Sequence, residues 1–235
     1  MRMRIFSFFL SGLWLCALAA HAGMPEYQTF PADGQRLLLW VASGQGRSDA
    51  ELAAARNLAR QGVEVWSLDP TSAYFLPPVA SSMDALPVED LAAWFGAARE
   101  TGKRVAVFAV ARAAVPVMRA AALLQPGPRS RLCVVLMHPN LYTVTTPLDE
   151  PDYLDPGDLS GLRVRVLQPR RSAATPWLPG LLERLSQHGA IVSDALLENL
   201  REDYWMRETP TDFEMAAGRH MDGMLLHQLD RWGCK

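Results

Sequence analysis

Short apolar runs alternate with longer amphipathic stretches along most of this chain. We predict strands at residues 36–42, 63–68, 104–110, 132–137, 164–167 and 190–197. We predict helices at residues 48–61, 87–101, 112–124, 175–188 and 211–232. Strands that are apolar on both faces are typical of a parallel sheet covered by helices on both sides. The pattern therefore predicts a three-layer α/β fold with a doubly wound, mostly parallel sheet of about six or seven strands.

Helix and loop signals agree with this arrangement. Ser48 and Glu51 form a predicted capping box, in which each side chain satisfies a free backbone N–H group of the first turn. We expect residues 69–86 and 138–161 to be irregular and residues 125–128 to break the chain. In the last predicted helix, an inward face is available from Met215, Met221, Leu225, Leu226 and Leu229.

The first 22 residues have the pattern of a secretory signal peptide. Arg2 and Arg4 precede an apolar run from Ile5 to Ala20, and Ala20-His21-Ala22 fits a cleavage site. We expect cleavage after Ala22 and export, with the periplasm as the expected compartment. The run is short for a membrane span of roughly 20 residues, and none comparable follows, so no span is expected in the mature chain. An uncleaved N-terminal anchor is the alternative.

The mature chain, residues 23–235, is predicted to form a single domain. Its 21 basic and 25 acidic residues give a formal charge of −4, so nothing favours nucleic acid as a partner. Its cysteines are Cys133 and Cys234, and an oxidising compartment would allow a disulfide between them. Two separate thiols are the alternative. No C-x-x-C motif suggests redox catalysis.

The turn after the strand at residues 104–110 carries alanine where a nucleophile often stands. Ala109-Val110-Ala111-Arg112-Ala113 takes the place of G-x-S-x-G, the strand–turn–helix motif of a catalytic serine. With the order of strands, helices and loops, this turn makes the chain resemble a small α/β-hydrolase over nearly its whole mature length. That resemblance implies an oxyanion-hole loop at Ser43-Gly44-Gln45-Gly46 and a degenerate nucleophile position at Ala111.

The other two triad positions that the resemblance implies also lack their expected residues. The acid is expected in Gln168-Pro169-Arg170-Arg171-Ser172, which holds no carboxylate. The histidine is expected within residues 198–205, which contain none. Because all three triad positions lack their expected residues, the sequence favours a protein of this fold that does not catalyse acyl transfer. A buried strand–turn–helix of another α/β fold is the alternative.

A dinucleotide site is a competing interpretation of the first strand and loop. Gly44-Gln45-Gly46 follows a strand, and Asp69 ends the next one. However, Asp49 stands where the third glycine belongs and would repel a pyrophosphate at the helix start. Asp69 is better interpreted as a strand-end residue bonded to the following turn. We therefore expect no cofactor.

Several other residues could carry chemistry. His138 follows a strand on the expected active face and could act as a base or ligand, or simply as a hydrogen-bonded strand-end residue. Ser43 and Ser72 are conceivable displaced nucleophiles without a base beside them in sequence. His220 and His227 lack the spacing and third ligand of a zinc site, so we expect no metal.

Arginines gather in the loops after the last two strands, where open α/β sheets bind ligands. Arg170, Arg171, Arg201 and Arg207, with Arg112, could receive a carboxylate or phosphate. The alternative is ion pairing with nearby carboxylates, namely Asp194, Glu198, Glu202, Asp203 and Glu208. Aromatic residues of the same region could line a groove or cover the core, namely Trp177, Tyr204 and Trp205.

Three functional hypotheses follow. The first is a non-catalytic exported protein that binds a protein partner or a small anionic ligand. Its candidate binding residues are Ser43, Gly44, Gln45, Arg112, His138, Arg170, Arg171 and Tyr204. The second is a carboxylic ester hydrolase with relocated machinery, in which Ser43 or His138 works with Asp69 or Asp149. The third is an accessory factor for envelope assembly or for a secreted enzyme, with the fold serving as a docking surface.

Overall fold

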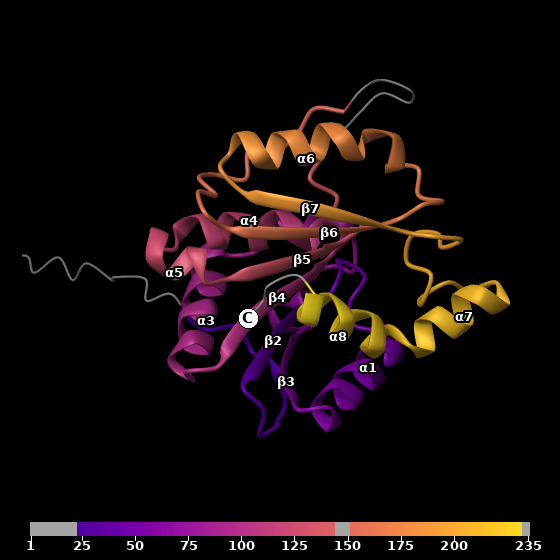
Figure 1. Ribbon diagram of the computed structural model, residues 1–235, viewed down its shortest axis with the longest axis horizontal. Coiled ribbons are helices and arrows are strands. Elements are labelled where there is room, and N and C mark those ends of the chain that lie inside the picture. The colour runs from indigo at the N-terminus through magenta and orange to yellow at the C-terminus, as the bar shows by residue number, and fades with distance from the viewer. Residues whose placement is uncertain (1–22, 144–150, 232–235) are drawn as a thin grey trace, which may run out of the picture.

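A seven-stranded, mostly parallel sheet runs through the protein in the order β1–β3–β2–β4–β5–β6–β7 (Figure 1). The computed structural model describes residues 23–143 and 151–231. Its strands are β1 (Gln28–Phe30), β2 (Arg36–Val41), β3 (Val63–Leu68), β4 (Arg104–Val110), β5 (Cys133–Met137), β6 (Arg163–Pro169) and β7 (Ile191–Leu197). Only β1 pairs antiparallel, with β3, among these strands. The predicted α/β fold is confirmed.

Helices cover both faces of the sheet (Figure 1). They are α1 (Asp49–Arg60), α2 (Pro70–Ala73), α3 (Val88–Glu100), α4 (Ala114–Leu123), α5 (Pro126–Ser130), α6 (Leu178–Gln187), α7 (Asp212–Arg219) and α8 (Met221–Arg231). Three 3-10 turns are η1 (Ala80–Ala85), η2 (Ala111–Ala113) and η3 (Thr175–Trp177). No helix among the described residues is both long and apolar enough to cross a bilayer.

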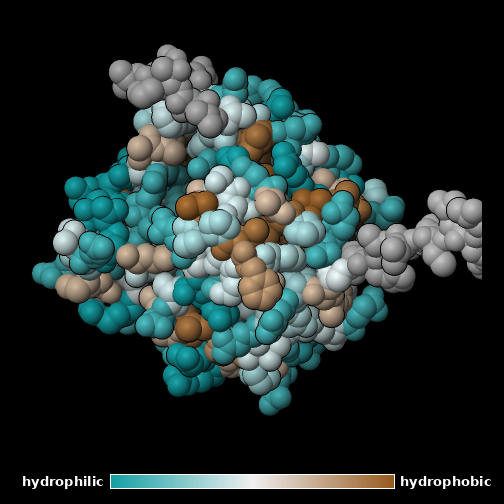
Figure 2. Space-filling model, turned by 180° about the vertical axis from the view of Figure 1, so that it is seen from behind, coloured by the Kyte–Doolittle hydropathy of each residue, from teal (hydrophilic) through white to brown (hydrophobic). Residues whose placement is uncertain are grey.

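Alternating residues of the central strands send side chains into two separate cores. Leu37 and Leu39 of β2 pack on the face that α3, α4 and α6 cover, whereas Leu38 and Trp40 pack on the face of α1 and α8. This two-sided burial explains why the strands are continuously apolar. The outer surface is mainly hydrophilic, with some hydrophobic groups near the middle of the face seen in Figure 2.

The carboxyl ends of β2 and β4 lie where the chain changes direction across the sheet. From β2 the chain crosses through α1 to β3 on one side, and it later returns to β4 on the other side of β2. α1 and α4 therefore cover opposite faces of the sheet. In open α/β sheets, such a switch point leaves a crevice at the carboxyl ends of the strands. The loops that begin at Ala42 and Ala111 meet this crevice.

Four local predictions are wrong. β1 adds an unpredicted edge strand, and the segment after Asp69, expected to be irregular, contains α2 and η1. Residues 125–128 do not simply break the chain, because Pro126 occupies the first turn of α5, where its missing N–H is tolerated. The predicted single last helix is two helices, since the backbone at His220 leaves the helical conformation (φ −108°, ψ 22°).

The predicted signal peptide and the predicted disulfide both involve residues that the structure does not describe. The predicted signal peptide, residues 1–22, lies outside the described part of the chain. Cys133 is disulfide-bonded. The partner predicted for it, Cys234, also lies outside the described residues, so the pairing itself stays a prediction.

Candidate functional site

Ala111 occupies a sharp turn between β4 and α4. Its φ of +51° is a conformation that costs a residue with a Cβ about 1 kcal/mol or more. The chain then passes through η2 directly into α4, and the carbonyl of Ala111 accepts a hydrogen bond from the N–H of Asn140 at 3.0 Å. A left-handed residue between a buried strand and a helix is the backbone geometry of a nucleophile elbow. Its side chain is a methyl group.

Backbone strain is concentrated at this edge of the sheet. Five residues other than glycine have positive φ among the described residues, and all of them lie in segments that follow the carboxyl ends of strands. They are Phe75, Ala111, His138, Asn199 and Asp203. Residues held in such conformations persist only where the surrounding structure enforces them, and they cluster at functional sites. The strain therefore marks the carboxyl edge as the candidate site.

The loop after β2 is tightly packed beside this site. Ser43 is buried, and its Oγ accepts a hydrogen bond from the N–H of Gln45 at 3.2 Å, while Gln45 is exposed. At Gly44, a Cβ would lie 2.6 Å from the carbonyl oxygen of Val79, so only glycine fits there. The segment that leads into η1 thus lies directly against the loop predicted to form an oxyanion hole.

Arg112 is held by fixed partners and does not offer its charge to a ligand. Its guanidinium makes a two-pronged contact with the Asp84 carboxylate, with both N···O distances 2.9 Å. A further N–H donates to the carbonyl of Tyr142 at 2.5 Å. The side chain thereby ties η1 to the loop after β5 across the Ala111 turn. Asp84 was not among the predicted site residues, because a lone carboxylate in an irregular loop gives no sequence signal.

Aromatic side chains cover the loop that Arg112 reaches. The Tyr142 ring lies 5.4 Å from that of Tyr153 and 6.1 Å from that of Trp177, centroid to centroid. Burial raises the pKa of the Tyr142 hydroxyl, so this group stays neutral. Trp177, predicted to line a groove or cover the core, belongs to this aromatic cover.

His138 lies at the end of β5 and faces Asp203 from the loop after β7. The two side chains approach to 3.0 Å between Nε2 and Oδ1, an ion-pair distance, although the atoms are not aligned for a hydrogen bond. His138 is buried, and its ring centroid is 5.8 Å from that of Trp205. A buried imidazole beside a carboxylate is the arrangement of a base and its orienting partner. Asp203 was predicted only as a partner for arginines.

A buried carboxyl group, that of Glu51, lies near this pair. Glu51 completes the predicted capping box with Ser48, and its side chain also accepts a hydrogen bond from the indole N–H of Trp40 at 3.2 Å. Burial raises the pKa of Glu51, and the negative charge of Asp203 acts in the same direction, against the hydrogen bonds from Ser48. The α1 side of the site thus holds a carboxyl group that resists ionisation.

Three of the arginines after β6 and β7 are engaged by neighbours, but only Arg170 pairs with one of the carboxylates that the ion-pairing alternative named. Arg170 pairs with Glu198 at 2.7 Å, and Arg207 donates to the carbonyl of Glu202 at 3.3 Å. Arg201 grips the buried Glu214 at 2.5 Å, and this contact holds the pKa of the Glu214 carboxyl below its usual range. Arg171 is exposed.

The position expected to hold the triad acid is occupied by other contacts. The Ser172 hydroxyl, near the end of β6, donates a hydrogen bond to the Glu202 carboxylate in the loop after β7. That loop also contributes Asp203, so its two carboxylates face Ser172 and His138 respectively. The contact between Ser172 and Glu202 therefore holds the loops after β6 and β7 together.

Asp69 has the structural role predicted for it. Its carboxylate accepts hydrogen bonds from the N–H groups of Arg47, Thr71 and Ser72 at 3.2–3.3 Å. Burial raises its pKa, but these hydrogen bonds outweigh that effect and hold it below the ordinary value. Such contacts leave Asp69 bound to its own loops, which disfavours the dinucleotide interpretation. Asp149, its suggested alternative in a relocated site, lies outside the described residues.

A groove of about 460 Å³ opens beside the His138–Asp203 pair. Ala50, Ala53 and Ala54 of α1 form one wall, and Tyr204 and Trp205 form another. Residues of α7 and the preceding loop complete the groove, namely Arg207, Pro210, Glu214, Met215, Gly218 and Arg219. Its size suits a small ligand, and its lining combines an apolar floor with two arginines. Tyr204, Trp205 and Arg207, which the sequence offered as candidates to line a groove or bind an anion, all line it.

The described residues contain no group of three or more His, Cys, Asp or Glu side chains suited to a metal ion. His220 ends α7, and His227 lies on α8, so the two are on different helices.

The structure brings Ala111 and Arg112 together at one turn, with His138 at the neighbouring strand end. Arg170 and Tyr204 instead follow the ends of β6 and β7 and make separate contacts.

Comparison with known proteins identifies the fold class. No protein-family description matches the chain, and no curated protein resembles it in sequence. Solved structures do match. A protein assigned as a dienelactone hydrolase from Klebsiella pneumoniae superposes with a TM-score of 0.60 at 16% identity, covering 86% of this chain and 88% of the other.

Two further structures agree. A hormone-sensitive lipase from a metagenome library matches with a TM-score of 0.54 at 18% identity, covering 83% of this chain and 78% of that one. The esterase Est22 matches at 0.59 and 12%, covering 88% and 80% respectively. The fold is therefore α/β-hydrolase-like. These neighbours are named as hydrolases or esterases, so they fit the hydrolase hypothesis better than a non-catalytic role. At such low sequence identities, however, the likeness establishes the fold and not the function.

Proposed function

We propose that this chain is a non-catalytic protein of α/β-hydrolase fold that serves as a binding or accessory factor in the cell envelope. The observation that carries the proposal is the methyl side chain of Ala111 at the elbow apex. A methyl group has no atom that a base could activate for attack on a carbonyl. The fixed contacts of Arg112 with Asp84 and Tyr142 support the same conclusion, because they brace the turn without leaving a charge for a substrate.

Export is part of this proposal. The sequence pattern of residues 1–22 supports it, and so does the disulfide at Cys133, because disulfides persist in oxidising compartments. We therefore assign the mature protein to the periplasm. Mass spectrometry of protein purified from the periplasmic fraction tests this assignment. A chain beginning at Gly23 is expected, and an intact Met1 in the membrane fraction would contradict export in mature form.

The groove between α1 and α7 is the proposed ligand site of this binding protein. Small side chains at Ala50, Ala53 and Ala54 leave room for an apolar body, and Tyr204 and Trp205 offer aromatic contact. Arg207 and Arg219 line the same groove and can attract a negative charge. A small amphipathic anion therefore fits this lining better than a neutral polar molecule.

Binding of 1-anilinonaphthalene-8-sulfonate, an amphipathic anion, tests the groove. Enhanced fluorescence is expected with the native protein, and Ala53→Phe, which fills the groove, should weaken it severalfold. Ala85→Phe is the matched control, because Ala85 is equally exposed but lies in η1 outside the groove. If both substitutions had the same effect, the groove would not be the binding site.

Assays of ester hydrolysis and probe labelling test whether the turn at Ala111 supports nucleophilic catalysis. We expect no hydrolysis of p-nitrophenyl acetate above the buffer rate and no labelling by a fluorophosphonate probe. The variant Ala111→Ser restores a hydroxyl at the apex, yet it should remain unlabelled, because the acid and histidine positions after β6 and β7 are vacant. Labelling of this variant alone would mean that a competent base still faces the turn.

The second candidate is a hydrolase with relocated catalytic residues, which the names of the structural neighbours favour. The approach of His138 to Asp203 is the specific feature that supports it. In this candidate, His138 acts as the base and Ser43 is the nearest sequence suggestion for a nucleophile. Ester hydrolysis by the native protein, lost in His138→Ala and in Ser43→Ala but retained in Ser72→Ala, would establish this candidate and refute the first.

A further inference from the structure

The loop that follows α2 carries the most exposed large hydrophobic side chain among the described residues. Phe75 is 95% exposed, and Val79, four residues further on, is 48% exposed. The residues between and beside them that are also exposed are Pro77, Pro78 and Ala80. Contiguous apolar side chains of this kind mark interaction sites, whereas single ones do not. We call residues 75–80 the apolar loop.

The backbone holds Phe75 in this position at a cost. Its φ of +52° is rare for a bulky residue, which meets a steric penalty in that conformation. The N–H of Leu76 donates to the carbonyl of Thr71 at 2.9 Å, and the N–H of Phe75 donates to the carbonyl of Ser72 at 3.4 Å. The two prolines that follow have a fixed φ and restrict the loop further. Defined contacts therefore present the Phe75 ring to solvent.

The other end of the apolar loop is fixed against the carboxyl edge of the sheet. The Ser82 hydroxyl donates to the carbonyl of Pro77 at 2.8 Å, and the Ser82 N–H donates to the carbonyl of Val79 at 3.1 Å. The same Val79 oxygen lies against Gly44 of the loop after β2. A surface that is already shaped before it binds loses less conformational entropy when it forms an interface.

The segment that contains the apolar loop carries no charged side chain. Residues 70–83 include no acidic residue, no basic residue and no histidine. The acidic residues at its two ends, Asp69 and Asp84, are engaged by their own turn and by Arg112 respectively. Another exposed aromatic residue, Phe213 of α7, instead stands between two acidic residues in sequence. The apolar loop thus combines exposure with neutrality.

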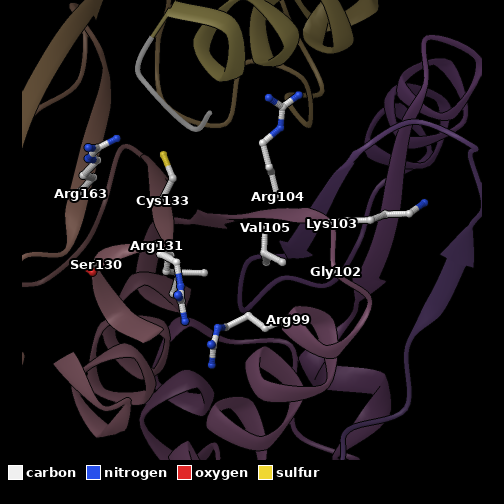
Figure 3. A pocket seen from close by; sticks show the side chains of 10 residues that line it. Arg99, Gly102, Lys103, Arg104, Val105, Ser130, Arg131, Cys133 and Arg163 are labelled. Atoms are coloured by element: carbon white, nitrogen blue, oxygen red, sulfur yellow. The ribbon is translucent and has the colours of Figure 1, made fainter. Parts of the chain in front are cut away.

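The amino edge of the sheet has the opposite character. A cavity of about 420 Å³ opens where α3 ends and where β4, β5 and β6 begin, and five of its lining residues are cationic (Figure 3). Figure 3 shows the side chains of Arg104 and Arg163 on one side of the strand ends and those of Arg99 and Arg131 on the other. Positive charge is therefore spread over both sides of this edge. A second molecule meeting it with the same edge would bring like charges together, which is unfavourable.

We propose that the apolar loop pairs with the same loop of a second copy of this chain in a two-fold symmetric homodimer. In such a dimer one surface meets itself, so a charge on it would face a like charge, and this loop has none. Interfaces between identical chains are also more apolar than those between proteins that meet transiently. This contact shares no residue with the groove at α1 and α7, so its test is independent of the proposed function.

A lipid surface fits the apolar loop less well than a second copy. Membrane binding grows with the apolar area that is inserted and with the attraction of basic residues to anionic lipids. The loop has no basic residue, and its few apolar side chains are smaller than a myristoyl chain, which by itself gives only marginal membrane binding. In a dimer, by contrast, each copy contributes its own Phe75 ring.

Sedimentation velocity from micromolar to millimolar protein concentration tests the dimer. We expect association that Phe75→Ser weakens about a hundredfold or more, since one substitution removes two buried rings from a symmetric interface. Phe213→Ser is the matched control, because Phe213 is 52% exposed on α7, outside the apolar loop, and should leave association unchanged. High salt should not weaken the dimer, because no ion pair contributes. The thermal midpoint of each variant verifies that it is folded.

Sedimentation with phosphatidylcholine vesicles covers the other occupant. A native protein that stays monomeric but binds these vesicles through Phe75 would show that the loop meets lipid, and the proposal would be wrong. It would also be wrong if the native protein stayed monomeric at millimolar concentration without binding vesicles, or if Phe213→Ser weakened the dimer as much as Phe75→Ser. A dimer that only Phe75→Ser disrupts supports the proposal.

Discussion

The amino and carboxyl edges of the sheet differ in which residue types adopt positive φ. At the amino edge, the residues that adopt positive φ just before strands are glycines, namely Gly62, Gly102, Gly161 and Gly189. At the carboxyl edge, residues with side chains take this conformation, Ala111 and His138 among them. Glycine carries no steric penalty there, whereas alanine and histidine do. The difference teaches that the carboxyl edge keeps a backbone shape that costs stability, as active-site edges do, although the residue at its sharpest turn is an alanine.

The edges also differ in how charge is compensated. At the carboxyl edge, Arg112 and Arg201 each grip a carboxylate through two nitrogen atoms. At the amino edge, Arg104 and Arg131 are instead exposed. Arg112 and Arg201 at the first edge are therefore part of the packing of the fold, whereas Arg104 and Arg131 at the second edge lie at the surface.

Removing an arginine from each edge gives the largest expected contrast. Arg201→Ala leaves the Glu214 carboxylate buried without its cation, and breaking such a pair costs about 3 kcal/mol when one partner is partly exposed. Arg104→Ala, at the amino edge, should change the free energy of unfolding by less than about 0.5 kcal/mol. Urea denaturation of both variants measures the two values. Equal losses would remove the distinction between the edges.

Acid should weaken the carboxyl edge through the same pair. Because Arg201 lowers the pKa of Glu214 in the folded protein, the ionised carboxylate stabilises the fold above its unfolded pKa of about 4.3. That contribution is lost as the pH falls below about 4 towards the folded value. Between pH 6 and pH 3, the thermal midpoint of the native protein should therefore fall more steeply than that of Glu214→Gln. Parallel curves would show that the pair does not titrate in this way.

An added methyl group at the amino edge should produce a smaller effect. Gly102 has φ of +71° and no atom within 4 Å of the position that a Cβ would take, so Gly102→Ala introduces conformational strain without a clash. We expect a loss of about 1 kcal/mol in the free energy of unfolding. Gly96→Ala, inside α3 and equally unobstructed, is the control and should not destabilise the protein.

Replacing alanine by glycine at the carboxyl edge should give the smallest change in the free energy of unfolding. Ala111→Gly relieves the left-handed strain but makes the unfolded chain more flexible, so a net gain of only about 0.5 kcal/mol is expected. Chemical denaturation of this variant beside the native protein measures it. A clear loss of stability would mean that the Ala111 methyl group contributes packing that outweighs its strain.

The central sheet was predictable from the sequence because burial on both faces leaves continuous apolar runs. β3 and β4 have the predicted bounds, and the Ser48–Glu51 capping box is present. β1 was missed because three residues at a half-exposed edge carry almost no periodic signal. The break between α7 and α8 was missed because Met221, Leu225 and Leu229 continue a helical pattern that Met215 does not share, being 41% exposed.

The sequence located the turn of the candidate site, but it did not predict the long-range contacts around that turn. The turn at Ala111 follows from the order of elements, and its left-handed backbone agrees with the motif. The contact between Arg112 and Asp84 joins positions 28 residues apart, and that between His138 and Asp203 joins even more distant loops. No local pattern encodes such partners, because they are brought together by the packing of whole loops.

β7 ends the sheet, and its outer side has no neighbouring strand among the described residues. An open edge of this kind can pair with the same strand of a second molecule and so start aggregation. Asp194, exposed at the centre of β7, would then face its own copy in an antiparallel pair. Two carboxylates directly opposite each other disfavour that pairing. One acidic side chain thus helps to keep this protein from extending its sheet into another molecule.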